Sequence, residues 1–125
     1  MTHLRFDKMP AMGRAGFRAF VARKPGGDVD TLPELSAEVS GVRMAPDRLQ
    51  AFRRVCLDTG QDTLPLTAPH VLAAPLHMTM LTDRAFPMPL LGLVHIDNRI
   101  VQHRPIPAEA ELDLSCRVGE LTRGD

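Results

Sequence analysis

Apolar and polar residues alternate in three stretches of the chain, at residues 35–44, 90–102 and 111–118. A period of two places successive side chains on opposite faces of a β-strand, so this pattern predicts three strands. Each strand would have one apolar face for a core and one polar face for solvent, which is typical of an antiparallel sheet.

The alternation is most regular in residues 90–102. One face of this predicted strand carries Val94, Ile96 and Ile100. The other face carries His95, Asp97, Arg99 and His103. We expect the first set to pack on a helix that contains Leu72, Leu76 and Met80, and the second set to point away from it. The second set is interpreted as a solvent-facing or dimer-facing row, with a proton-transfer group as the alternative.

Ala45-Pro46-Asp47 predicts the start of a helix. Proline suits the first helical position, where its missing N–H is not needed, and an acidic residue there lies at the positive end of the helix dipole. The inner face would carry Leu49, Phe52 and Cys56, at i, i+3 and i+7. The outer face would carry Arg48, Arg53 and Arg54. Asp58-Thr59-Gly60 would end the helix.

Residues 69–82 are apolar nearly throughout and contain no charged residue. A helix with no polar face must be enclosed by other elements. Pro75 removes a backbone donor within this segment and crowds the preceding turn. The helix is therefore expected to kink at Pro75 or to have its regular part begin close to it.

This order of elements predicts an α+β domain, with a sheet wrapped round one enclosed helix. Three strands are few for that purpose, and the last one would end near Gly119. We therefore expect residues 31–125 to be a partial domain, incomplete at its C-terminal end, and residues 1–30 to be a basic leader and linker.

The expected leader, residues 1–24, holds six basic residues and one acidic residue, whereas the remainder holds nine basic and fourteen acidic residues. Phe17, Phe20 and Val21 have helical spacing, so a short amphipathic helix or a frayed terminus is predicted. The turn-rich residues 24–28 would separate this leader from the folded part.

The composition narrows the class of protein. Fifteen basic and fifteen acidic residues cancel, and Trp and Tyr are absent, so a nucleic-acid partner is not expected. No apolar run approaches the roughly 20 residues that a bilayer span requires. Without a secretory segment, Cys56 and Cys116 are interpreted as reduced, buried thiols in a cytoplasmic protein.

Two stretches of the chain carry a family resemblance. Residues 64–76, with the sequence Leu-Pro-Leu-Thr-Ala-Pro-His-Val-Leu-Ala-Ala-Pro-Leu, and residues 92–100, Gly-Leu-Val-His-Ile-Asp-Asn-Arg-Ile, resemble the N-terminal half of MaoC-like acyl dehydratases. The resemblance extends over roughly residues 32–117. It implies a hot-dog fold, in which a sheet surrounds a central helix, and an enzyme that interconverts 3-hydroxyacyl and enoyl thioesters without a metal or other cofactor.

The family's catalytic loop has the pattern Gly-Asp-x-Asn-Pro-x-His. By resemblance, Asp62 stands at the position of the Asp, but Thr67 stands where the His is expected. His70 matches the His at the start of the central helix, whereas Val71 replaces the glycine that follows it in the family. Asp62 and His70 are therefore the catalytic candidates that remain, and this half is expected to be non-catalytic. His70 as a helix-start histidine bonded to nearby backbone is the alternative interpretation, and a hydrogen-bonded core histidine is the interpretation of His77.

The resemblance further implies that this half forms a wall of the acyl-binding site. The predicted substrate-binding residues are Pro69, His70, Val71, Leu72 and Leu76. The expected partners are an acyl-CoA or acyl-carrier-protein thioester and a catalytic hot-dog half. Two alternatives remain: the accessory subunit of a heterodimeric dehydratase, and a hot-dog thioesterase, which would need a carboxylate near the buried helix.

Overall fold

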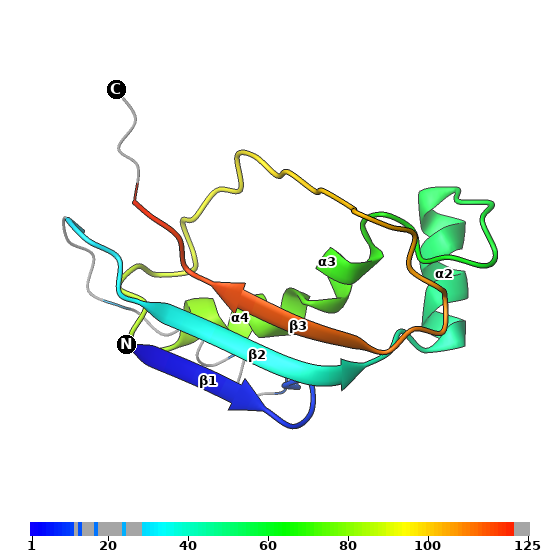
Figure 1. The fold of residues 1–125 in the computed structure, drawn as a ribbon. Coiled ribbons are helices and arrows are strands. Elements are labelled where there is room, and N and C mark those ends of the chain that lie inside the picture. The colour runs from blue at the N-terminus through cyan, green and yellow to red at the C-terminus, as the bar shows by residue number, and fades with distance from the viewer. Residues whose placement is uncertain (12, 14–16, 18–23, 25–28, 122–125) are drawn as a thin grey trace.

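The computed structural model describes residues 1–11, 13, 17, 24 and 29–121, which form a three-stranded sheet with helices (Figure 1). The strands are β1, Thr2–Phe6; β2, Leu35–Val42; and β3, Leu112–Arg117. The helices are α2, Pro46–Cys56; α3, Ala68–Leu72; and α4, Ala74–Thr82. Helix α4 lies on one face of the sheet, and α2 lies beyond the end of β2. The α+β class is thus confirmed.

Strand β2 is the centre of the sheet. It pairs antiparallel with β3, and the register has an irregularity between Val39 and Val42. Gly41 lies within that irregularity with φ +69°, which a residue with a side chain rarely adopts. The strands predicted at residues 35–44 and 111–118 are therefore confirmed. Strand β1 pairs in parallel with β2, so the sheet is mixed. The prediction of a wholly antiparallel sheet is therefore wrong.

Strand β1 lies within the segment that was predicted to be a leader, and the sequence analysis missed it. Its partners on β2 run from Thr2 opposite Leu35 to Phe6 opposite Val39. Part of the basic charge of this segment belongs to Arg5, on the polar side of β1. Arg5 Nε lies 3.3 Å from a carboxylate oxygen of Glu38 on the neighbouring strand. The division of the chain at residue 30 stays a prediction.

The rest of the predicted leader falls largely outside the described residues. Of the predicted helix, Phe17 is described, but Phe20 and Val21 are not, and of the break at residues 24–28 only Lys24 is described. The ammonium group of Lys24 donates hydrogen bonds to the carbonyls of Leu81, Asp83 and Phe86, at 3.1, 2.6 and 2.8 Å. Burial lowers the pKa of this amine, and Asp83 opposes that effect. Lys24 therefore caps carbonyls around the end of α4.

The strand predicted at residues 90–102 is wrong. This segment forms no strand, and residues 91–105 are exposed along their whole length. Val94 is 78% exposed and Ile96 is 91% exposed, so the predicted packing of this segment on the central helix is also wrong. In Figure 1 the segment runs well apart from the sheet, in yellow to orange, between α4 and β3. A strand needs a neighbour for its backbone groups, and the described part of the chain gives this segment none.

Helix α2 begins at Pro46, as predicted, and ends at Cys56, followed by Leu57 in a left-handed conformation with φ 54°. Leu49 is buried, as expected. Cys56 is exposed, so its interpretation as a buried thiol is wrong; the helix reaches past the core at its last turn. The expectation that Arg53 points outside is also wrong, because its side chain is only 12% exposed.

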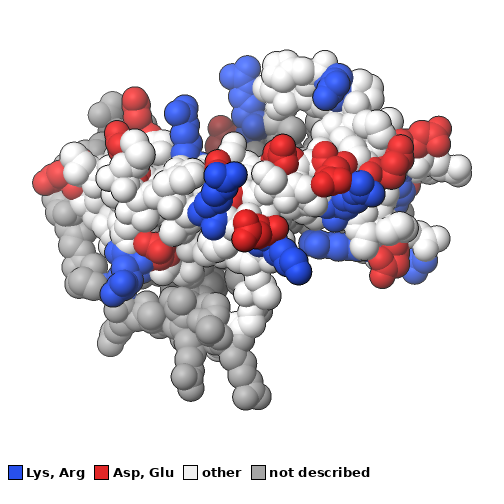
Figure 2. Space-filling view, turned by 60° about the horizontal axis from the view of Figure 1, so that its bottom comes forward, with Lys and Arg blue, Asp and Glu red and all other residues white. Residues whose placement is uncertain are grey.

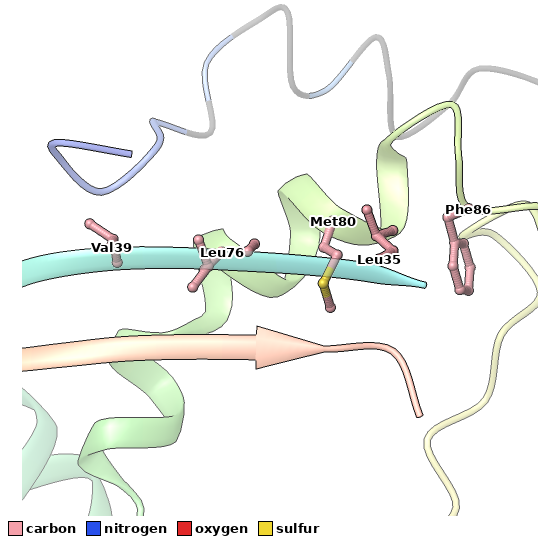
Figure 3. Close-up of a cluster of buried hydrophobic side chains, with 6 residues drawn as sticks. Leu35, Val39, Leu76, Met80 and Phe86 are labelled. Carbon is pink, nitrogen blue, oxygen red and sulfur yellow. The ribbon is translucent and has the colours of Figure 1, made fainter. Parts of the chain in front are cut away.

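The apolar segment divides at Ala73 into α3 and α4. Pro75 lies in the first turn of α4, where its missing N–H removes no helical hydrogen bond, so the second of the two predicted arrangements is confirmed. Figure 3 shows one side of α4 packed on β2. The six buried members of this cluster are Leu35, Ala37, Val39, Leu76, Met80 and Phe86. The other side of α4 is only half-buried, so the described strands cover this helix on one side.

Candidate functional site

The candidate site is the loop between α2 and α3, residues 58–67, together with the start of α3. Arg53 holds the first part of this loop. Its guanidinium donates to a carboxylate oxygen of Asp58 at 2.6 Å, to the carbonyl of Gln61 at 3.3 Å and to the carbonyl of Thr63. The sequence analysis missed this function of Arg53. The carboxylate five residues further along the chain was the available signal.

The second part of the loop is held by the chain that leads into β3. Thr63 and Pro107 form an isolated β-bridge. On either side of it, the amide of Leu64 donates to the carbonyl of Ile106 at 2.7 Å, and the amide of Ala108 donates to the carbonyl of Asp62 at 2.9 Å. The Leu64 side chain is buried between α2 and α3. The backbone of the loop is thus fixed through hydrogen bonds and one buried anchor.

Asp62 itself points to solvent. Its residue is exposed, and within the described part of the chain its carboxylate has no hydrogen bond or ion pair. A general base needs a defined position relative to the proton that it removes. The arrangement of the loop fixes the backbone of Asp62 but provides no such position for its carboxylate.

His70 and His77 come together although they belong to different helices. Their ring centroids are 5.2 Å apart, with the rings tilted by 48°. His70 is exposed, whereas His77 is half-buried. In the described part of the chain, neither ring forms a hydrogen bond. The interpretation of His70 as bonded to nearby backbone is therefore wrong, and so is that of His77 as a hydrogen-bonded core histidine. Burial lowers the pKa of His77, and the neighbouring His70 lowers it further.

This lowered pKa predicts a pH-dependent stability. Between the folded-state pKa of His77 and the ordinary value of 6.5, the unfolded chain binds more protons, so the free energy of unfolding should rise with pH through that window. His77→Gln should flatten this dependence, because glutamine does not titrate. Thermal melts at about pH 5 and about pH 7.5 would measure it. The exposed His103 provides the control: if His103→Gln flattened the dependence as much as His77→Gln, the assignment would be wrong.

The predicted substrate-binding residues divide into two groups. Pro69, His70 and Val71 are half-buried or exposed at the start of α3. Leu72 is 3% exposed and Leu76 is 0% exposed, so both side chains lie within the core. The structure thus gives a ligand access only to the first group. Their assignment to an acyl-binding wall stays a prediction.

Two open grooves lie on the described surface, and the first is bordered by the beginning of the candidate loop. One, of about 1210 Å³, lies between the start of α2 and residues 58–61, with Arg43, Asp47 and Gly60 among its lining residues. The other, of about 980 Å³, lies at the end of the sheet where β2 begins and β3 ends. Asp62 and His70 line neither of them. The loop and the two grooves therefore do not form one enclosed reaction chamber from described residues.

The described residues provide little for a metal or for a charged polymer. Among them, no three His, Cys, Asp or Glu side chains lie where they could hold a metal ion. Figure 2 shows basic and acidic side chains interspersed over the face in view, with no extended region of one sign. No helix in this part of the chain has the length and apolar character needed to cross a bilayer.

Comparison with known proteins supports the similarity to a dehydratase, but not its assignment to a particular half of that enzyme. No protein-family model matches the chain, and no solved structure matches it. Over 92 residues, the chain is 29% identical to 3-hydroxyacyl-thioester dehydratase X of Mycobacterium tuberculosis. The aligned region covers 74% of this chain and 33% of that relative, so the chain spans about a third of the relative's length. The α+β architecture is compatible with a hot-dog fold, and the chain is similar to a 3-hydroxyacyl-thioester dehydratase.

Proposed function

We propose that this chain is the non-catalytic half of a MaoC-like hot-dog dehydratase, which provides fold and acyl-binding wall while a catalytic half supplies the acid–base groups. The assembly acts on an acyl-CoA or acyl-carrier-protein thioester. It adds water across the double bond between the α and β carbons of the acyl chain, or removes water from these two carbons to form that double bond. This reaction moves a proton and a hydroxide, so it requires no electron carrier.

The observation that carries the non-catalytic assignment is the backbone at the start of α3. By resemblance, the amide of Val71 takes the place of the donor that stabilises the thioester oxyanion. Here that amide donates to the carbonyl of Thr67 at 3.1 Å. A donor that is already engaged within the helix cannot stabilise a developing negative charge unless that bond breaks. The Val71 side chain also occupies the space that a glycine would leave open.

The pair of acid–base groups is also incomplete in the loop of this half. Thr67 stands at the position of the catalytic His, and a threonine hydroxyl does not accept a proton near neutral pH. In the described part, no ion pair joins His70 to a carboxylate, and the Asp62 carboxylate has no partner that would orient it. Losing a positioned acid or base costs a factor of about 10²–10⁴ in rate. Both losses together favour a supporting function for this half.

The test is a hydration assay with crotonyl-CoA, followed through the loss of the enoyl-thioester absorbance. The chain alone should give no turnover above buffer. A mixture with a hot-dog domain that carries the Gly-Asp-x-Asn-Pro-x-His loop should be at least about tenfold faster than that domain alone. In the mixture, Asp62→Asn should change the rate by less than about twofold, because Asp62 does not take part in the chemistry.

Two results would contradict this proposal. One is turnover by the isolated chain that falls about 100-fold or more on Asp62→Asn or His70→Ala, which would make this half catalytic. The other is a mixture no faster than the catalytic domain alone, although gel filtration shows that the two proteins associate. The latter would leave the chain without a function in the reaction.

A further inference from the structure

A serine, a histidine and a glutamate come together on the outer face of the sheet. The buried residues of β2 pack under α4, so the residues that alternate with them lie on the opposite face. The Oγ of Ser36 lies 2.7 Å from Nδ1 of His3, and Nε2 of the same ring lies 3.4 Å from a carboxylate oxygen of Glu38. Hydroxyl, imidazole and carboxylate therefore follow one another in the order that an activated serine requires.

The register of the sheet places a fourth group beside them. Ser36 has His3 of β1 as its partner on one side and Arg117 of β3 as its partner on the other (Figure 1). Directly opposite residues of an antiparallel pair point to the same face, with Cβ atoms about 4.5–5.5 Å apart. A base, a hydroxyl and a cation thus form one row across three strands.

The carboxylate of Glu38 defines the tautomer of the His3 ring. It is held in turn by Arg5, whose Nε lies 3.3 Å from the same oxygen that faces the ring. When Nε2 carries its proton toward this carboxylate, the neutral ring presents the lone pair of Nδ1 to Ser36. The ring can then accept the hydroxyl proton. Because the side chains of His3 and Glu38 are 47% and 38% exposed, a substrate can reach the row from solvent.

The groove at this end of the sheet has room for a substrate beside the serine. Its volume is about 980 Å³, and Ser36 and Arg117 are both among its lining residues. Leu32, Val118 and Leu121 line it as well and would contact an apolar group. The guanidinium of Arg117 can donate hydrogen bonds to a carbonyl oxygen that becomes negative when Ser36 attacks the carbonyl carbon.

We propose that Ser36 is the nucleophile of an esterase site on the outer face of the sheet. His3 is its general base, and Arg117 stabilises the oxyanion. Glu38 is a positioning residue, because it acts through the His3 ring and does not contact the substrate. The site lies on the face of the sheet opposite α4 and shares no residue with the site at α3, so it goes beyond the function proposed above.

The groove also limits the substrate class. Its apolar lining residues suit a short acyl chain. A leaving group that carries phosphates would be repelled, because three carboxylates line the groove, those of Asp30, Glu34 and Glu120. The expected substrate is therefore a carboxylic ester of an uncharged alcohol.

The reaction consists of two balanced steps. In the first, Ser36 Oγ bonds to the carbonyl carbon while its proton passes to His3 Nδ1. The bond from that carbon to the alcohol oxygen then breaks, and the alcohol leaves with the proton from His3. In the second, water adds to the acyl carbon and gives a proton to His3, which returns it to Ser36 Oγ as the carboxylic acid leaves.

A fluorophosphonate probe tests the nucleophile in the full chain, because it bonds to an activated serine and releases fluoride. Peptide mass spectrometry should find the adduct on Ser36. Ser36→Ala should abolish it, and His3→Gln should slow its formation about 100-fold or more. Ser115→Ala is the matched control and should leave the labelling rate unchanged. Ser115 lies opposite Glu38 on the same face, but among the described residues it forms no hydrogen bond to a histidine.

Hydrolysis of p-nitrophenyl butyrate, followed by absorbance, tests the other groups. The chain should exceed free imidazole at the same concentration about 100-fold or more. Arg117→Gln should lower kcat about tenfold or more. Glu38→Gln should lower kcat about tenfold with KM unchanged, because glutamine fills the same space without fixing the ring. Butyryl-CoA should react about tenfold more slowly than the ester, and circular dichroism would verify the fold of each variant.

Three results would overturn the proposal. They are no adduct under conditions that fully label a known serine hydrolase, equal labelling of Ser36 and Ser115, and ester hydrolysis that Ser36→Ala leaves unchanged. Faster turnover of butyryl-CoA than of the ester would overturn the substrate assignment. All these results concern cleavage of an acyl bond. The dehydratase proposal is tested by hydration of a double bond, so the two proposals fail separately.

Discussion

Replacing Leu76 with alanine is expected to lower the free energy of unfolding by about 3–5 kcal/mol. The Leu76 side chain is 0% exposed and lies where α4 meets β2, among Leu35, Val39 and Met80 (Figure 3). Removing its branched end takes away buried apolar surface and leaves a cavity that a sheet on one side and a helix on the other can only partly close. A small domain has a total stability of about 5–15 kcal/mol, so this loss is a large share of it.

Urea denaturation followed by circular dichroism would measure the Leu76 effect. Leu91→Ala makes the same chemical change at a residue that is 56% exposed, and it should cost less than about 0.5 kcal/mol. Leu76→Met conserves volume and should cost less than about 1.5 kcal/mol. Should Leu76→Ala and Leu91→Ala cost the same, α4 would not be packed on the sheet as the structure has it.

The alternation of apolar residues predicted β2 and β3 correctly. It did so because other parts of the chain pack on one face of each strand. On β2, the inward residues Leu35, Ala37 and Val39 are buried under α4, and the residues between them are partly exposed. Residues 93–103 alternate more regularly and yet form no strand. Alternation determines which face of a strand would be buried, but pairing depends on a neighbouring strand, about which a local pattern contains no information.

Strand β1 is the opposite case, because it is a strand that was not predicted. Thr2, Leu4 and Phe6 point inward and His3 and Arg5 outward, so the period of two was present in the sequence. The basic charge of the first 24 residues favoured a leader, and the short pattern was not identified. In the structure this charge has a local partner, because both His3 and Arg5 lie near the carboxylate of Glu38 on the neighbouring strand. Charge counts cannot detect such pairing across strands.

The sequence located the candidate loop but not what holds it. The resemblance identified residues 60–71 through the positions of Asp62, Thr67 and Val71, and the engaged amide of Val71 supports the proposal drawn from them. The bridge between Thr63 and Pro107 joins residues 44 positions apart, and local patterns do not predict such contacts. Helical spacing likewise placed Arg53 outside, since it does not consider that a loop folds back over the end of the helix.

Arg53 therefore provides the second large stability prediction. Its side chain is only 12% exposed, and it bonds the Asp58 carboxylate and the carbonyls of Gln61 and Thr63. Arg53→Met keeps much of the apolar stem but leaves these acceptors without their donor. Because hydrogen bonds to charged groups contribute about 1.5–3 kcal/mol, we expect the free energy of unfolding to fall by about 2–3 kcal/mol.

The matched control for Arg53 is the next residue, because Arg54 lies on the same helix but is exposed. Arg54→Met should change the free energy of unfolding by less than about 0.5 kcal/mol. Arg53→Met should also make residues 58–63 a site of proteolytic cleavage under native conditions, since the loop loses its connection to α2. Equal stability of the two variants, with no new cleavage in this loop, would mean that the bridge to Pro107 alone holds the candidate site and that Arg53 contributes nothing to it.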